Sequence, residues 1–429
     1  MFVLKSNETY KVYEQGNAIR KTVDYGDYWL PPKIFERLES FSIRSGDIIV
    51  SCAGTIGETY VIPDGAPKGV INQALLRLTL NPEIIDEQYF LLMFKSLVDT
   101  LKANAVGSAI KNLASIKFLK YETPFLLPPM KEQKRIVAKV QKMITLVKLY
   151  THSYERLKEI NKKLPDKLRK SILQYAMQGK LVSQDPNDEP VEVLLENIRA
   201  EKQKLFKEGK LKKKDLQESI IYKGDDNSYY EKIGGTIEKI DAPYEIPNTW
   251  HWMRLGELCS YIQRGKSPKY IEQSDIPVIS QKSIQWSGFN LAPSRFLNPD
   301  AINGYDKQRF VTNNDLLWCS TGTGTVGRIG IFTDIDRNGY NTIVADSHVT
   351  VVRRFKSINS KYILAYLSSP EIQMNIDEIT TGSTKQRELG LVTIKQILVP
   401  VCGTSEQKKV IDSILQFEKH IENIAEFVQ

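Results

Sequence analysis

Residues 46–55 read GDIIVSCAGT, and residues 314–323 read NDLLWCSTGT. Both stretches continue through a glycine into a short apolar run. Further similar pairs follow in the same order at an offset of about 270 residues: Gly107-Ser108 with Gly382-Ser383, Ile116-Lys117-Phe118 with Ile394-Lys395-Gln396, and Glu132-Gln133-Lys134 with Glu406-Gln407-Lys408. A repeat of this length indicates a duplicated domain rather than a short solenoid unit. Two related domains suit a pseudo-symmetric, two-part ligand, and DNA is the commonest ligand of that kind.

The composition favours a multidomain protein without disulfides or membrane spans. The chain has 429 residues, which suggests two or three domains, and its net charge of +8 weakly favours an anionic partner. The four cysteines, Cys52, Cys259, Cys319 and Cys402, form no CxxC pair, which argues against a zinc site and for a reducing compartment. There is no apolar core of signal-peptide length and no apolar run of roughly 18–20 residues. We therefore expect a cytoplasmic protein without membrane contact.

The hydrophobic pattern divides the chain into two globular domains. The first domain, residues 1–129, contains strand-like runs at Asp47–Ser51, Glu58–Ile62 and Ala74–Leu80 and a helical pattern at Gln88–Lys102. Residues 181–242 are polar and charged and are predicted to be a linker. The lysine cluster at 210–214 in this segment is better explained by solvation than by DNA contact. The second domain is predicted at residues 243–400.

A heptad pattern follows each predicted domain. Residues 130–180 are predicted to form a helix from Lys131 to Leu164, about 50 Å long at ~1.5 Å per residue, and a second helix that starts at Pro165 and ends near Gly179. The predicted coiled-coil positions of the first helix are Ile136, Val140, Met143, Val147, Tyr150, Tyr154, Leu157 and Leu164, and those of the C-terminal helix at residues 401–429 are Val410, Ile414, Phe417, Ile421 and Ile424. We expect the two patterns to pair as an antiparallel coiled coil that separates the domains. The alternative is that each helix packs on its own domain.

Three stretches of the sequence resemble a known family. From Gly179, the sequence GKLVSQDPNDEPVEVLLENIRAEKQKL and its continuation to Lys214 resemble the central conserved region of type I restriction–modification specificity subunits. YEIPNTWHWMRLGEL at residues 244–258 resembles the usual opening of a target recognition domain in that family. PPMKEQKRIV at residues 128–137 resembles the start of its spacer helix, and residues 400–410 are a weaker copy.

This resemblance implies a fold and a function. The expected fold class is α+β, with two mixed α/β target recognition domains separated by long antiparallel coiled-coil helices in a pseudo-two-fold repeat. Each domain would read one half of a split sequence in double-stranded DNA. The subunit would dock two methyltransferase subunits and ATP-dependent restriction subunits, which would bind S-adenosylmethionine, ATP and Mg, so that no cofactor is expected in this chain. From the repeat offset, we expect the first domain to lack its opening ~25 residues relative to the second; either the true start lies upstream, or the sequence is a fragment or a recombined gene.

No catalytic motif is found in the sequence. Residues 322–327 spell GxGxxG, but the following Arg328-Ile-Gly-Ile-Phe favours a strand, whereas a dinucleotide site requires a helix there. Arg328 also stands where a P-loop requires lysine. The four histidines, His152, His251, His348 and His420, lack the spacing of metal ligands. The prediction is therefore a non-catalytic DNA-specificity subunit; the alternative is a coiled-coil structural adaptor that does not bind DNA.

Candidate DNA-binding residues are polar or basic residues near predicted turns. Phosphates attract Lys, Arg and hydroxyl groups, and base edges attract Arg, Asn, Gln and Lys. In the second domain, the candidates are Arg264, Lys266, Gln281, Lys282, Ser383, Thr384, Lys385, Gln386 and Arg387. In the first domain, they are Gln15, Asn17, Arg20, Ser108, Lys111 and Asn112. For each residue, the competing interpretation is an ordinary solvated loop.

Overall fold

The structure is a computed structural model of the full chain, and it describes residues 2–103, 116–383 and 386–428. The chain divides into two compact units, Met1–Arg156 (unit 1) and Leu157–Gln429 (unit 2), and the division falls inside one long helix. Helices and strands are mixed within both units, as in the predicted α+β class.

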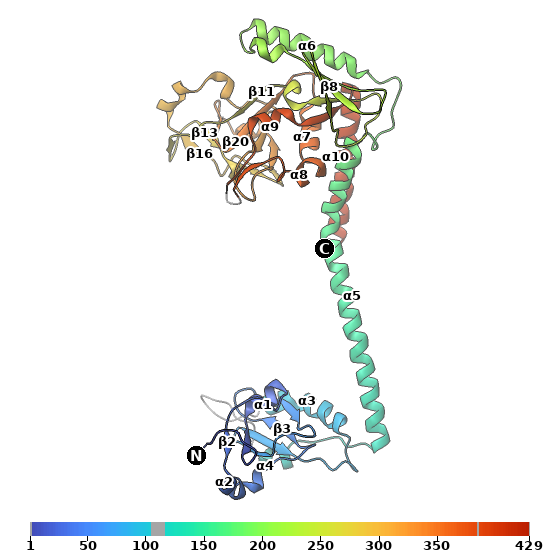
Figure 1. Cartoon of the computed structure of the whole chain (residues 1–429), viewed down its shortest axis with the longest axis vertical. Coiled ribbons are helices and arrows are strands. Elements are labelled where there is room, and N and C mark those ends of the chain that lie inside the picture. Colours follow the sequence, from blue (N-terminus) through green and yellow to red (C-terminus); the bar gives the residue numbers. More distant parts are fainter. Residues whose placement is uncertain (1, 104–115, 384–385, 429) are drawn as a thin grey trace. The chain divides into compact units, whose positions relative to one another are not determined.

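Unit 1 contains two small sheets with helices around them (Figure 1). Its strands are β1 (Tyr10–Tyr13), β2 (Trp29–Leu30), β3 (Ile48–Ser51), β4 (Thr59–Val61), β5 (Gly69–Ile71) and β6 (Leu75–Leu78). Its helices are α1 (Gln15–Arg20), α2 (Pro32–Arg37), α3 (Glu87–Ala103), α4 (Ile116–Tyr121) and the first part of α5 (Met130–Met177). Every residue of β3 is buried, because its Ile-Ile-Val run is apolar on both faces. The strands and the helix predicted in this region are confirmed within one or two residues at each end.

Unit 2 contains the remainder of α5, α6 (Val191–Lys207) and a series of small sheets. The strands are β7 (Ser219–Lys223), β8 (Tyr229–Ile233), β9 (Thr236–Ile240), β10 (His251–Arg254), β11 (Cys259–Arg264), β12 (Tyr270–Ile271), β13 (Pro277–Ile279), β14 (Ile284–Gln285), β15 (Gly288–Phe289), β16 (Arg295–Leu297), β17 (Leu316–Cys319), β18 (Ile329–Ile331), β19 (Val344–Ala345), β20 (Val349–Arg354), β21 (Thr381–Ser383), β22 (Gln386–Glu388) and β23 (Leu398–Val401). The further helices are α7 (Ser360–Leu367), α8 (Pro370–Met374), α9 (Leu391–Gln396) and α10 (Thr404–Val428).

Both sheets of unit 1 have counterparts with the same connectivity in unit 2. In unit 1, β3 lies between β4 and β6, and in unit 2, β17 lies between β18 and β20; all four pairings are antiparallel. The other sheet is repeated in the same way. In unit 1, β1 pairs antiparallel with β2 and parallel with β5, and in unit 2, β13 pairs antiparallel with β16 and parallel with β19. The repeated stretches quoted first, at residues 46–55 and 314–323, contain the two central strands β3 and β17.

The repeated Glu-Gln-Lys sequence places a buried glutamine at the start of a helix in each unit. The Nε2 of Gln133 donates to the carbonyls of Ile84 and Pro128 at 2.9 Å each, and its Oε1 accepts from a backbone amide at 2.8 Å. In unit 2, the Oε1 of Gln407 accepts from the amide of Asn359 at 3.1 Å, and its Nε2 donates to the carbonyl of Cys402 at 2.9 Å. Both glutamines thus tie the helix start to neighbouring loops.

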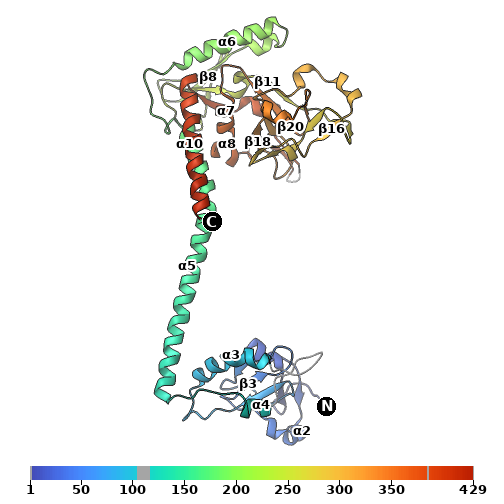
Figure 2. The ribbon, with the colours of Figure 1, turned by 180° about the vertical axis from the view of Figure 1, so that it is seen from behind.

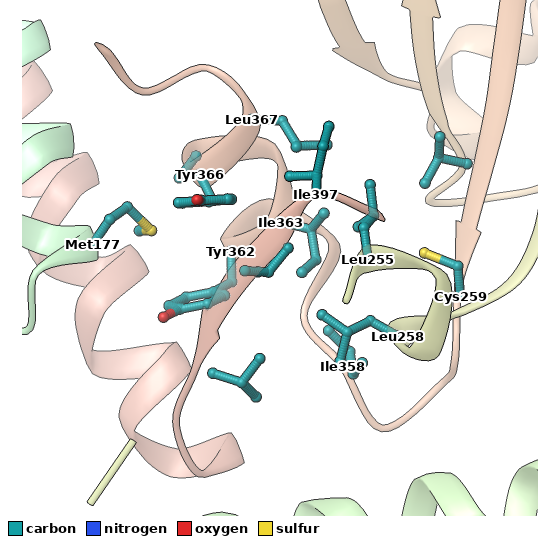
Figure 3. Close-up of a cluster of buried hydrophobic side chains, with 14 of the residues drawn as sticks. Met177, Leu255, Leu258, Cys259, Ile358, Tyr362, Ile363, Tyr366, Leu367 and Ile397 are labelled. Carbon is teal, nitrogen blue, oxygen red and sulfur yellow. The ribbon is translucent and has the colours of Figure 1, made fainter. Parts of the chain in front are cut away.

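The main core of unit 2 joins helices and strands from distant parts of the sequence (Figure 3). Tyr362 and Tyr366 of α7 are fully buried, and they lie near Met177 at the end of α5. Leu255 and Leu258 come from the short turn before β11 and are also fully buried. The end of α5 is therefore built into the core of unit 2.

The segment at residues 181–242, predicted to be a linker, is folded instead. Val191, Leu194 and Ile198 of α6 are buried in the main core of unit 2, and Ile221 of β7 joins them. Strands β7, β8 and β9 form an antiparallel sheet, and α6 lies above this sheet in Figure 1. The physical reason is that the apolar residues of α6 recur at positions i, i+3 and i+7, which gives this charged helix one buried face.

The helix break predicted at Pro165 is absent, because α5 runs without interruption from Met130 to Met177. A proline inside a helix removes one backbone hydrogen bond and crowds the preceding turn, but it does not always end the helix. The long, periodic sequence on both sides of Pro165 maintains the helix.

Within unit 2, α10 lies antiparallel beside the C-terminal part of α5 (Figures 1 and 2). Val410, Ile414 and Ile421 of α10 are buried, and Val410 and Ile414 belong to the same core cluster as Met177. The predicted coiled-coil positions Ile136, Val140 and Leu164 of α5 are half-buried. In contrast, the positions between them are exposed: Met143, Val147, Tyr150, Tyr154 and Leu157, together with Phe417 and Ile424 of α10. The heptad residues from Met143 to Leu157 therefore form an uncovered apolar strip, called the α5 seam below.

None of the helices in the described parts of the chain has the length and apolar composition needed to cross a lipid bilayer.

Candidate nucleic-acid interface

Four segments of unit 2 meet at one end of the sheet β11-β20-β17-β18. They are residues 281–287, 320–328, 346–348, and 381–383 with 386–388, called the loop cluster below. In an antiparallel sheet, the end of one strand lies beside the start of its neighbour. Accordingly, Cys319 at the end of β17 pairs with Val349 at the start of β20. The loop that follows β17 and the loop that precedes β20 must therefore lie at the same end of the sheet.

The glycine-rich loop at residues 320–328 connects two strands. Gly322, Gly324 and Gly327 all have positive φ angles, 91°, 79° and 92°, which residues with a Cβ rarely adopt. Strand β18 begins at Ile329 directly after this loop, so the predicted strand is confirmed. Because no helix N-terminus follows the glycines, the geometry of a dinucleotide site is absent here.

Side-chain and backbone hydrogen bonds hold the four segments together. The hydroxyl of Thr321 lies 2.6 Å from Nδ1 of His348 and accepts from Nε2 of Gln281 at 3.1 Å. The amide of Gly322 donates to the carbonyl of Arg387 at 3.1 Å. Three loops and the β21–β22 hairpin therefore form one connected surface.

Arg264 and Lys266, two predicted DNA contacts, are engaged within the protein. The guanidinium of Arg264 donates to Glu388 at 2.7 Å and to the carbonyl of Leu389 at 2.8 Å. The ammonium of Lys266 donates to the carbonyl of Gly304 at 2.6 Å. The structure thus gives Arg264 a positioning function, because it ties β11 to the β21–β22 hairpin.

Gly382 and Ser383 of the predicted Gly-Ser-Thr turn belong to strand β21. Ser383 pairs with Gln386 in the hairpin register. Thr384 and Lys385, which connect them, lie outside the described residues.

Two further predicted basic residues differ in their availability. Arg387 is paired with Asp377, and its side chain is 29% exposed. Lys282 is exposed and has no side-chain ion pair among the described residues. Lys282 is therefore the more accessible of these two cations.

Gln15 of unit 1 and Gln281 of unit 2 make equivalent contacts. The Nε2 of Gln15 donates to the carbonyl of Ala53, and the Nε2 of Gln281 donates to the carbonyl of Thr321. In each unit, the acceptor lies in the loop that follows the central strand. The amides of these predicted DNA contacts therefore hold loops in place within the fold.

Asn17 is buried, contrary to its prediction as a DNA contact. Its amide donates to the carbonyls of Thr22 and Tyr25 at 2.9 and 3.0 Å, which closes the turn after α1. Arg20 is exposed, with its guanidinium 4.7 Å from the ring centre of Tyr25, and it remains accessible. The other predicted contacts of unit 1 lie outside the described residues: Ser108, Lys111 and Asn112.

Burial affects two titratable groups at the base of the loop cluster. Burial raises the pKa of the Asp346 carboxyl, and the amide of His348, which donates to its Oδ1 at 2.9 Å, acts in the opposite direction. Burial raises the pKa of the Cys319 thiol to about 12, so this thiol stays protonated at neutral pH. Within the described part of the chain, no group of three or more His, Cys, Asp or Glu side chains is arranged to hold a metal ion.

The sequence prediction missed three residues of the loop cluster. Trp286 is 61% exposed, and Gln285 beside it accepts from Arg328 at 2.9 Å. The available signal was the short Ile-Gln-Trp-Ser-Gly-Phe pattern, in which Trp286 and Ser287 are the two loop residues of a hairpin and a glycine follows them.

Comparisons with known proteins identify the family. Residues 3–159 and 247–426 match the family model described as the type I restriction modification DNA specificity domain. The chain is 30% identical over 250 residues to the type I restriction enzyme EcoAI specificity subunit of Escherichia coli, a match that covers 57% of this chain and 38% of that relative. It is 28% identical over 260 residues to the EcoEI specificity subunit of Escherichia coli, with 59% of this chain and 40% of the relative covered. The chain thus spans less than half the length of these two relatives.

A more distant relative and a solved structure are similar over most of the chain. The EcoBI specificity subunit of Escherichia coli is 22% identical over 386 residues, with 90% of this chain and 69% of that protein covered. The crystal structure of the HsdS subunit from Thermoanaerobacter tengcongensis matches with a TM-score of 0.42 and 15% identity, over 97% of this chain and 84% of that one. The family model matches well over half of the residues of this chain. This chain therefore belongs to the family of type I restriction–modification DNA specificity subunits.

Proposed function

We propose that this chain is the DNA-reading subunit of a type I restriction–modification complex and that each of its two units reads one half of a bipartite sequence. The observation that carries the proposal is that the specificity-domain model matches twice, once in each unit. The equivalent sheets β4-β3-β6 and β18-β17-β20 support it, because two similar readers suit two half-sites. The halves would lie about one helical turn apart, ~34–36 Å, on one face of the duplex.

The loop cluster provides the chemistry that reading DNA requires. It presents amide, hydroxyl and basic groups, and Lys282 is exposed among them. Such groups bind phosphates and base edges. In unit 1, the exposed Arg20 is the corresponding candidate. The differences between the polar residues of the two units are those expected of readers of different half-sites.

The reactions would belong to partner proteins. Two methyltransferase subunits would bind S-adenosylmethionine and methylate adenine, and restriction subunits would use ATP and Mg. The α5 seam supports a docking function, because an exposed heptad pattern binds a partner helix. This uncovered strip is also the feature that favours the alternative, a structural adaptor that binds protein but not DNA.

A methyl-transfer assay tests the proposal. The full chain, its methyltransferase subunit and the two together are each incubated with host DNA and radiolabelled S-adenosylmethionine. We expect transfer only by the mixture, because the methyltransferase alone has no reader. Transfer by this chain alone would contradict the proposal.

A binding measurement separates the proposal from the adaptor alternative. The affinity of the full chain for duplex DNA is measured over a range of salt concentrations. DNA binding through phosphates weakens steeply as salt rises. Absence of binding at low salt, both for the chain and for its complex with the methyltransferase, would favour the adaptor.

A further inference from the structure

Trp286 is the exposed exception among the five tryptophans of the chain. Its side chain is 61% exposed, whereas Trp29, Trp250, Trp252 and Trp318 are 7%, 3%, 2% and 0% exposed. An indole has a large apolar surface, so leaving it in water forgoes the free energy that burial would provide. A bound partner that covered the Trp286 ring would therefore gain the free energy of burying it.

The hairpin that carries Trp286 is firmly anchored. Trp286 follows β14, and β15 begins two residues later at Gly288. Ile284 of β14 is fully buried, and the ring of Phe289 packs edge-on against Phe332 with 5.5 Å between ring centres. The indole is therefore presented from a rigid support, which lowers the entropy that binding would cost.

A hydrogen-bonded brace connects this hairpin to the glycine-rich loop. Arg328 donates to Oε1 of Gln285 at 2.9 Å and to the carbonyl of Gly324 at 2.8 Å. Nε2 of Gln285 donates to the carbonyl of Lys282 at 3.1 Å. Trp286 thus stands directly beside the residues that the proposed function assigns to DNA.

The charges around Trp286 favour DNA as its partner. Residues 280–292 and 319–331 contain no acidic residue, and each range contributes one cation, Lys282 and Arg328. Of the two carboxylates in the loop cluster, Glu388 is paired with Arg264 at 2.7 Å and Asp346 is buried. A surface that combines an aromatic ring, amides, hydroxyls and cations suits the phosphates and base edges of DNA. We propose that Trp286 makes an apolar contact with the bases of the half-site that unit 2 reads, an inference that rests on the proposed function.

This contact is specific to unit 2. The β14–β15 hairpin lies between β13 and β16 along the chain, whereas unit 1 has helix α1 between the corresponding strands β1 and β2. A change at Trp286 therefore affects recognition of one half of the target and leaves the other half unchanged.

The test compares Trp286→Ala and Trp286→Phe in the full chain bound to its methyltransferase subunits. The matched control is Ile335→Ala, because Ile335 is another exposed apolar side chain of unit 2, 89% exposed and outside the loop cluster. We expect Trp286→Ala to weaken binding to the target sequence roughly ten-fold, the order of magnitude of losing the contacts to one base pair of a specific site. Trp286→Phe should retain most of the affinity, and Ile335→Ala should retain all of it.

Two further readouts identify the kind of contact. The slope of log affinity against log salt should be unchanged in Trp286→Ala, because an indole displaces no counterion, whereas Lys282→Ala should lower the slope by about one. DNA should protect the wild-type fluorescence from acrylamide quenching. The Trp286→Phe variant should show no such protection, since its four other tryptophans are buried.

The outcomes separate this inference from the proposed function. If the wild-type complex binds no DNA, both are overturned. If the wild type binds its target and Trp286→Ala binds it equally well, only the contact of Trp286 is overturned. If Trp286→Ala instead weakens assembly with the methyltransferase in the absence of DNA, the indole contacts protein and the inference is again wrong.

Discussion

The side chains of the buried residues Gln133 and Gln407 form hydrogen bonds with backbone groups of loops. Backbone groups inside helices and strands form such bonds with one another instead. Each one satisfies both an amide and a carbonyl from loops near a helix start. Leaving a buried polar group without a partner costs roughly 1–3 kcal/mol. The repeated Glu-Gln-Lys sequence is thus explained by the fold rather than by contact with a ligand.

Replacing Gln407 by alanine tests this explanation. Gln407→Ala leaves the amide of Asn359 and the carbonyl of Cys402 without this partner, and we expect the free energy of unfolding of unit 2 to fall by about 2–4 kcal/mol. Gln416→Ala on the exposed face of the same helix is the control and should change it by less than about 0.5 kcal/mol. Urea unfolding followed by circular dichroism measures both. Equal stabilities for the two variants would show that the buried amide is dispensable.

The contribution of individual side chains at the candidate interface could be predicted only in part from the sequence. The sequence located the glycine-rich loop, because glycines and polar residues between apolar runs indicate turns. It did not show that Gln15, Gln281 and Arg264 hold loops in place, since a polar residue bound to a distant carbonyl has no local signature. Trp286 was missed because a tryptophan is ordinarily assigned to the core.

At the scale of elements, the segment at residues 181–242 is attached to the rest of unit 2 by an ion pair. Arg254 of β10 donates to Glu231 of β8 from Nη2 at 2.5 Å and from Nε at 3.1 Å. The two side chains are only 18% and 8% exposed. The hydrogen bonds from Arg254 lower the pKa of the Glu231 carboxyl below its usual value, although burial opposes this shift.

The ion pair predicts a pH-dependent stability. A carboxyl with a lowered folded pKa stabilises the fold above its unfolded pKa of about 4.3, and this stabilisation is lost as the pH falls through the folded pKa. We expect Glu231→Gln to lower the free energy of unfolding by about 2 kcal/mol at pH 7 and to converge with the wild type in acid. The control is Glu238→Gln, at the exposed position paired with Glu231 across the sheet. If Glu231→Gln remained less stable than the wild type by the same free energy of unfolding down to pH 2, the charge of Glu231 could not be the cause of the difference.

The regular elements were more predictable than their partners. The strands around residues 47–80 and the helix near residues 88–102 follow from apolar periodicity, which is a local property. The continuous α5 does not, because whether Pro165 ends a helix depends on the rest of that helix. The apolar spacing of Val191, Leu194 and Ile198 predicts the buried face of α6. We did not assign this face from the sequence, because most of the residues around these three are charged.

Helix α5 is proposed to set the distance between the half-sites. Deleting residues 143–149 removes one heptad, shortens the helix by ~10 Å and preserves its helical phase to within about 20°. We expect the preferred gap in the target to shorten by about three base pairs, or binding of the bipartite target to be lost. Lys142→Ala and Lys148→Ala are controls on the same helix and should leave the gap unchanged. An unaltered gap preference in the deletion variant would show that α5 does not determine the spacing.

Across the whole molecule, we propose that this chain reads the DNA sequence and that its partner subunits carry out the reactions. The two matches to the specificity-domain family and the equivalent sheets of the two units agree with this division. On the proposed function, the net charge of +8 would contribute a general attraction to DNA, and sequence selection would depend on the loops of each unit.

Mapping of methylated adenines across the host genome tests this division most directly. The map is made for the wild-type strain, for a strain without this gene and for the gene-deleted strain complemented with the intact gene. We predict one bipartite methylated sequence, with a fixed unread gap, that disappears on deletion and returns on complementation. An identical set of methylated adenines with and without the gene would contradict the account.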